Sequence, residues 1–246
     1  MIRIVLFARM LFITMVMTVA AASLFALTSP ASPASAGSTL PDKDKEVNDR
    51  PADMRAIYAI EDRAEAIAEG EKSGNVAIVA GRQAFAKWSA LRATLAQKGA
   101  SAGQLTQMDT RMNELASRLH DARGLKRAAN DATGALAPLF AIVGESIPAD
   151  VHTLDYLGRS IGLDASTAQW SRASQDAYAL DRAWHRLKMI IVARADSGKV
   201  TLAFNNAVRQ ARDGVHDRNA VETQTGATAV GNAVDAVEGL YVKAGR

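Results

Sequence analysis

Two histidine-aspartate pairs have the residue types and the repeated spacing that metal chemistry requires. His120-Asp121 and His216-Asp217 stand 96 positions apart, and each follows an apolar helical pattern. Imidazole and carboxylate groups bind zinc, copper or iron, so a fold that joined the pairs would create a divalent-metal site. The alternative is that both pairs only stabilise helix ends. A histidine in the last turn of a helix interacts favourably with the helix dipole, and aspartate is common in the turn that follows.

A second polar group comes from one short segment. His152, Asp155 and Arg159 are spaced three and four residues apart, which places them on one face of a helix. This face predicts a groove for a ligand or partner, with drift of a structural surface as the alternative. Trp170 stands between polar neighbours, and a partly exposed tryptophan can mark a contact surface. We add it to the same candidate groove.

Standard catalytic signals are missing from the sequence. There is no Gly-x-Ser-x-Gly, His-Glu-x-x-His, phosphate-binding glycine loop or EF-hand loop. The chain has no cysteine, which excludes thiolate nucleophiles, thiolate metal ligands and covalently attached haem. Met108 and Met112 lie one helical turn apart, and we interpret them as core residues. The sequence favours a non-enzymatic protein without a predicted cofactor.

The N-terminus has the pattern of a secretory signal. Arg3 and Arg9 precede an apolar run from Leu11 to Leu27, and Ala34-Ser35-Ala36 follows as a small-residue cleavage site. We predict a signal peptide over residues 1–36 with cleavage after Ala36. The alanine-rich composition is typical of a Gram-negative bacterium, so the mature chain is expected in the periplasm.

The alternative is that the apolar run remains as an inner-membrane anchor. Its length lies near the lower limit for crossing a bilayer, where about 17 to 25 residues are needed. In that case the membrane is contacted only through this N-terminal segment.

If the signal peptide is cleaved instead, loss of Arg3 and Arg9 leaves 27 basic and 26 acidic residues. This near-neutral balance and the lack of basic clusters argue against nucleic acid as a partner.

The elements that position these residues are predicted to be helices. Residues 37–50 are polar and form a flexible linker. From Pro51 onward the chain is rich in helix formers and carries apolar residues at helical spacing. The predicted helices begin near Pro51, before Phe85, before Leu105, near Lys126, at Pro148, before Tyr178, near Thr201 and near Thr225.

The two halves of this pattern resemble each other. Trp88 and Trp184 lie 96 positions apart, as do the histidine-aspartate pairs, and the apolar stripe of each third helix follows the same offset. Pro51-Ala52-Asp53 matches Pro148-Ala149-Asp150 at an offset of 97. We predict an internal duplication with halves at 51–143 and 144–246. The alternative is chance, since amphipathic helical hairpins align easily.

Together these patterns predict an all-α protein of about eight helices, in two duplicated antiparallel four-helix halves behind a signal peptide. The halves form either two bundles or one larger bundle, packed together as one helical domain. The expected function is a periplasmic binding or interaction module for an unknown small molecule or periplasmic protein. The alternative is a metal- or haem-binding bundle that uses the histidine-aspartate pairs.

Overall fold

The computed structural model describes residues 50–244. The predicted signal peptide and the linker up to residue 49 lie outside the described residues. Eight α-helices and one short 3-10 helix make up the described part of the chain, without a strand. No helix in this part is long and apolar enough to cross a membrane. The all-α prediction is therefore confirmed.

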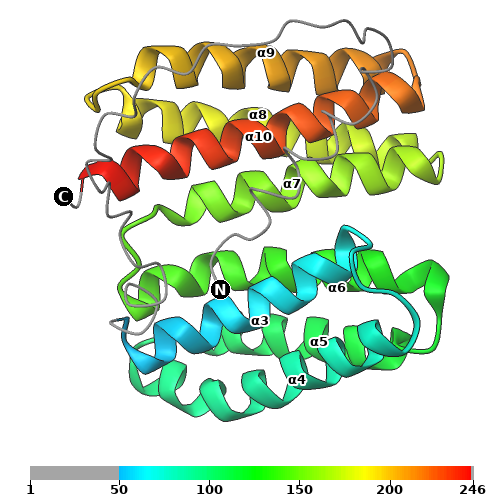
Figure 1. Ribbon diagram of the computed structural model, residues 1–246, viewed down its shortest axis with the longest axis vertical. Coiled ribbons are helices and arrows are strands. Elements are labelled where there is room, and N and C mark those ends of the chain that lie inside the picture. Colours follow the sequence, from blue (N-terminus) through cyan, green and yellow to red (C-terminus); the bar gives the residue numbers. More distant parts are fainter. Residues whose placement is uncertain (1–49, 245–246) are drawn as a thin grey trace, which may run out of the picture. The chain divides into compact units, whose positions relative to one another are not determined.

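The first four helices form an antiparallel bundle (Figure 1). Each helix packs against the next along the chain, and the fourth returns to pack against the first. A 3-10 turn, η1 (Ala141–Val143), ends this half. The bounds are α3 (Ala52–Ala68), α4 (Gly74–Gln97), α5 (Ala102–Arg118) and α6 (Ala122–Phe140).

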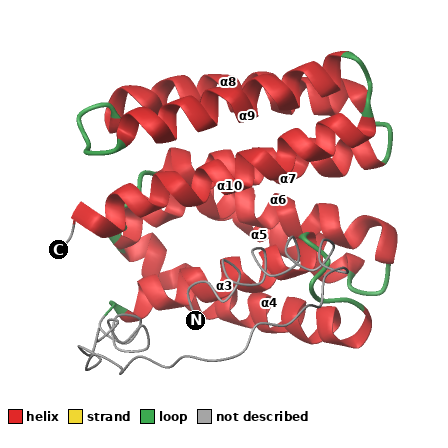
Figure 2. Cartoon of the chain, turned by 45° about the horizontal axis from the view of Figure 1, so that its top comes forward, coloured by secondary structure: helices red, strands yellow, loops and turns green. Residues whose placement is uncertain are grey.

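The last four helices repeat this ring of contacts as a second antiparallel bundle (Figure 2). The two bundles meet where α6 packs against α7. The structure thus has two bundles, each with its own apolar core, rather than one merged core. The bounds are α7 (Ala149–Ser166), α8 (Trp170–Ile191), α9 (Ser197–His216) and α10 (Ala220–Ala244).

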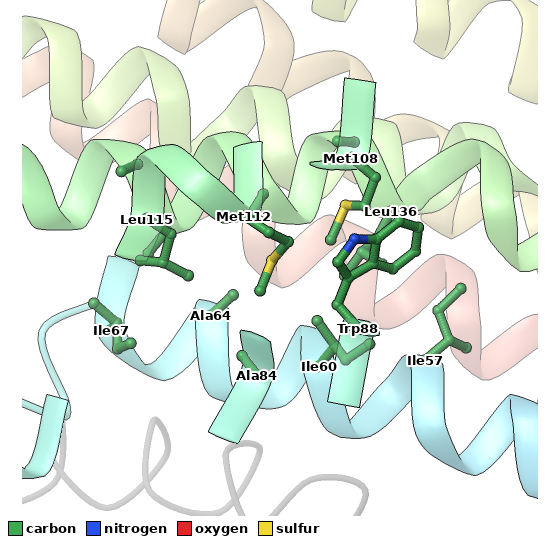
Figure 3. Packing of buried hydrophobic residues seen from close by; sticks show 14 of the residues in the cluster. Ile57, Ile60, Ala64, Ile67, Ala84, Trp88, Met108, Met112, Leu115 and Leu136 are labelled. Atoms are coloured by element: carbon green, nitrogen blue, oxygen red, sulfur yellow. The ribbon is translucent and has the colours of Figure 1, made fainter. Parts of the chain in front are cut away.

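The first core gathers the apolar stripes of its four helices around one tryptophan. Met108 and Met112 of α5 point into this core together with Trp88 (Figure 3). Both methionines are fully buried, as the interpretation of them as core residues requires. The indole of Trp88 donates a hydrogen bond to Asp109 Oδ1 at 2.8 Å, so α4 and α5 are joined by packing and by one polar contact.

The second core has the same arrangement at equivalent positions. Trp184 stacks on Phe204, with ring centroids 4.1 Å apart and an interplanar angle of 11°. Its indole donates to Asn205 Oδ1 at 2.8 Å. In both halves the tryptophan and its acceptor are separated by 21 residues. Each half therefore holds its second and third helices together with the same contact.

Three helices, α6, α9 and α10, begin four or five residues before their predicted starts. Helix α9 begins at Ser197 instead of near Thr201. Helix α10 begins at Ala220, five residues before Thr225. The side-chain oxygen of Asn219 accepts hydrogen bonds from the backbone amides of Val221 and Glu222, which is the action of an N-cap. Helix α6 begins at Ala122 rather than near Lys126, because the helix continues through Gly124.

Candidate functional site

The most extensive polar cluster lies where the two bundles meet. Glu61, Glu65 and Glu69 are spaced four residues apart on and just beyond α3, so they share one face. They face His152, Asp155 and Arg159 of α7, the predicted groove residues. We call these residues, together with Asn130 and Thr133 of α6, the polar seam.

Arg159 is the centre of the polar seam. Its Nη1 lies 2.5 Å from Glu65 Oε1, 2.6 Å from Asp155 Oδ2 and 3.8 Å from Glu69 Oε1. Burial alone would lower its pKa, but the three surrounding carboxylates raise it, so the guanidinium stays charged. One side chain therefore neutralises carboxylates from both halves of the protein.

The carboxylates of the seam outnumber the cations that face them. Burial raises the pKa of Glu65 well above its usual range. Arg159 opposes this rise, and the neighbouring carboxylates of Asp155, Glu61 and Glu69 add to it. The pKa of Glu65 is therefore raised by burial and by the crowded carboxylates, against the opposing charge of one guanidinium.

Helix α6 supplies neutral hydrogen-bonding groups to the same cluster. Arg159 Nε donates to Asn130 Oδ1 at 3.0 Å, and Nη2 lies 3.4 Å from Thr133 Oγ1. The Asn130 amide in turn donates to Ser160 Oγ at 2.9 Å. Close approach of α6 and α7 is possible because Gly134 leaves room for the Tyr156 ring. The side chains of the seam are thus fixed by three helices.

His152 lies at the other end of the seam. Its Nδ1 is 3.0 Å from Glu61 Oε1, and its ring stacks on Phe140 with centroids 3.7 Å apart and an interplanar angle of 4°. Tyr58 packs edge-on against Phe140 and donates a hydrogen bond to Glu145. His152 Nε2 is buried and has no hydrogen-bond partner among the described residues.

A second charged cluster lies further along α6 and α7. Arg127 lies 2.8 Å from Asp131, 2.7 Å from Asp164 of α7 and 3.9 Å from Asp176 of α8. Burial raises the pKa of Asp176 to about 6, and Asp164 contributes to the rise. One oxygen each of Asp164 and Asp176 is buried without a hydrogen-bond partner in the described part of the chain. A proton held at Asp176 gives these two oxygens a donor.

The predicted groove residues are brought together, but they are covered rather than open. His152 is buried, and the side chain of Arg159 is only 11% exposed. Trp170, the first residue of α8, is half-buried and lies outside the polar seam as defined above. Sequence spacing revealed the shared face of α7. The seam residues of α3 and α6 were not identified from sequence, and the four-residue spacing of the three glutamates was the one signal that could have indicated them.

The histidine-aspartate pairs lie at helix ends. His120 is exposed just after α5, and Asp121 pairs with Arg118 at 2.9 Å. His216 ends α9, and both it and Asp217 are exposed. Among the described residues, no group of three or more histidine, aspartate and glutamate side chains is placed to hold a metal ion. The structure does not bring the two pairs into one such site.

One open groove lies elsewhere, between the start of α3 and the end of α4. It has a volume of about 450 Å³ and includes Lys87, Thr94 and Leu91 in its lining. Lys98 also lines it, but its ammonium group is paired with the Asp53 carboxylate. The remaining lining is mostly alanine, so the groove offers few directed polar contacts.

An apolar surface occurs at the turn between α8 and α9. Met189, Ile190 and Val192 are 76%, 52% and 67% exposed, and Leu202 on α9 is 63% exposed. Helix α8 ends at Ile191 and α9 begins at Ser197, so all four lie within about two helical turns of the connection. We call these four residues the hairpin tip. They are large apolar side chains that the fold leaves in contact with solvent.

Comparison with known proteins adds no assignment, because no family model, curated protein or solved structure matches this chain.

Proposed function

We propose that the protein is an exported, non-enzymatic interaction module that contacts its partner through the hairpin tip. The exposure of Met189, Ile190, Val192 and Leu202 carries this proposal. Large apolar side chains at a surface are unremarkable singly, but several within two helical turns of one connection mark an interaction site. The polar seam is consistent with this view, since His152 and Arg159 are covered between α3, α6 and α7 instead of lining an open site.

The module is a duplicated helical unit in this proposal. The matching Trp88–Asp109 and Trp184–Asn205 hydrogen bonds support a duplication, because the same contact occurs at the same separation in each half. Buried stripe residues also correspond, with Met108 and Met112 of α5 at the positions of Phe204 and Val208 of α9. A shared ancestor explains why both halves build the same ring of four helices.

The two halves have diverged in the surfaces that they expose. The seam joins α3, α6 and α7, whereas the hairpin tip lies at the ends of α8 and α9. Export rests on the pattern of residues 1–36, and the alanine-rich composition together with this signal favours the periplasm. An exposed apolar surface on an exported helical scaffold suits a binding role.

Site-specific photocrosslinking in the producing cells tests this function. A photoreactive amino acid at Met189 or Leu202 should yield an adduct with a protein or with lipid, because the tip contacts its partner. The matched control is Val79 of α4, which is apolar and 53% exposed but lies outside the tip. Absence of adducts from both tip positions, or equal yields from Val79, would contradict the proposal.

A further inference from the structure

We infer that the hairpin tip docks on the surface of an anionic phospholipid bilayer. This inference rests on the proposed function and names the partner class of the same site. The tip combines exposed apolar side chains with surrounding positive charge. Those two features together are what interfacial membrane binding requires, since apolar groups enter the headgroup region while cations attract anionic lipids.

The charge around the tip has the required sign. Between His185 and Leu202 the chain has four basic residues and one acidic residue. Lys199 is exposed on the first turn of α9, and Lys188 is half-buried on the last turn of α8. The whole segment from Trp170 to His216 has eight basic and four acidic residues, so the positive charge continues along both helices.

Two of the local cations are partly occupied by the protein itself. Arg186 pairs with Asp150 at 2.5 Å, and Arg194 lies over the Tyr241 ring at 3.6 Å. Lys188 and Lys199 are therefore the groups best placed to attract lipid phosphates. Each basic residue near an anionic membrane surface adds to the attraction, and salt weakens this contribution.

The form of the surface favours a bilayer over a folded protein partner. The tip is the end of a helical hairpin and exposes four apolar side chains. A stable protein interface uses about 20 to 30 residues from each side, which is far more than this group supplies. A bilayer accepts a small projecting cluster, because the lipid headgroups adapt to its shape.

If the hairpin tip docks on a bilayer, the end of the unit that carries the α8–α9 connection faces the membrane. The α8–α9 connection lies at the same end of the unit as the start of α3 (Figure 1). The described chain therefore begins at the end that the inference directs toward the membrane. Val76 and Val79 lie near the start of α4, at the opposite end.

Fluorescence from a labelled tip tests the inference directly. The native chain has no cysteine, so Val192→Cys gives a single attachment point for an environment-sensitive dye. We expect a blue shift on adding vesicles of phosphatidylglycerol and phosphatidylethanolamine to the full protein. Neutral phosphatidylcholine vesicles should give a much smaller change, and raising the salt from about 0.05 M to about 0.5 M should reverse the shift.

Matched variants separate the tip from other sources of binding. In the labelled protein, Met189→Ser with Leu202→Ser should weaken vesicle affinity at least tenfold. Val76→Ser with Val79→Ser removes equally exposed apolar groups and should leave the affinity unchanged. A dye at Val79→Cys should show no blue shift. Unchanged affinity in the tip variant, or equal response to neutral vesicles, would overturn the inference.

The outcomes distinguish this inference from the proposed function. Protein adducts from Met189 in cells, without a vesicle response, would retain the interaction module and exclude the bilayer as its partner. Lipid adducts together with the vesicle response support both. Neither adducts nor a vesicle response would overturn both.

Discussion

The guanidinium of Arg159 on α7 lies 2.5 Å from the carboxylate of Glu65 on α3, a residue 94 positions earlier in the chain. This ion pair joins the two bundles directly. It is surrounded by Asp155, Glu69 and the Asn130 amide. The connection between the halves therefore depends on a buried, charged group whose removal leaves several partners unsatisfied.

Replacing Arg159 with methionine should destabilise the protein by about 3 to 5 kcal/mol, since breaking one side of a buried ion pair leaves the other charge uncompensated. The free energy of unfolding from urea denaturation measures this effect. Arg118→Gln is the control, because its pair with Asp121 is exposed on both sides and should contribute less than about 1 kcal/mol. Equal effects of the two variants would show that the Arg159 cluster does not hold the halves together.

The Glu61–His152 pair offers a double-mutant test of the same interface. His152→Phe should preserve stacking on Phe140 but leave the buried Glu61 carboxylate without the partner 3.0 Å away. We expect a loss of about 3 kcal/mol in the free energy of unfolding.

Adding Glu61→Leu to that variant should return stability to within about 1 kcal/mol of the original protein, because replacing both partners of a buried hydrogen bond with apolar groups is often nearly neutral. Removal of Glu61 also relieves its repulsion of Glu65. Thermal denaturation of the single and double variants measures the coupling. If the loss of stability in the double variant equals the sum of the losses in the two single variants, the side chains of Glu61 and His152 are not coupled.

The sequence predicts the helices well because their signals are local. Periodic apolar residues identify each helix, and Pro148 stands immediately before α7 as expected. The stripe of α5, including Met108 and Met112, is buried as its spacing implies. The shared face of His152, Asp155 and Arg159 follows from the same helical geometry.

The tertiary partners of those residues are less accessible from sequence. Glu65 meets Arg159 only because α3 and α7 come from different bundles that pack together, and no local rule encodes that approach. The hairpin tip was also missed by the sequence analysis, but here the local pattern itself was misleading. Met189 and Val192 look like core residues in an apolar run, but the core-facing side of α8 is taken by Leu187 and Ile191.

Asp176 should make stability depend on pH. Its pKa of about 6 in the folded protein exceeds the ordinary value of 3.8 because of burial and the nearby Asp164, against the opposing charges of Arg127 and Arg172. The folded state then binds more protons than the unfolded state between these values. Stability must therefore fall as the pH rises from about 4 through 6.

Asp176→Asn should remove this loss. The pKa difference corresponds to at most about 3 kcal/mol, and partial exposure reduces it further. We compare the free energy of unfolding of the variant with that of the original protein at each pH. This difference should favour the variant by about 1 to 2 kcal/mol more at pH 7.5 than at pH 4. Urea denaturation at both values measures the change. Asp213→Asn, at an exposed position of α9, is the control, and an equal gain there would refute the assignment to Asp176.

Close packing of α9 and α10 provides the most direct test of the second bundle. A Cβ atom at Gly226 would lie 2.4 Å from the backbone nitrogen of Ala211 and 2.5 Å from its Cα. Backbone cannot rotate away as a side chain can, so Gly226→Ala must separate the helices. We expect a loss of about 3 kcal/mol in the free energy of unfolding, at the upper end of overpacking effects.

The control is Gly239→Ala, which lies on the same helix with no atom within 4 Å of the new Cβ. It should stabilise the protein by about 0.5 to 1 kcal/mol through helix propensity. Opposite signs for two identical substitutions on α10 would confirm the close approach, whereas stabilisation by both would show that α9 and α10 lie further apart.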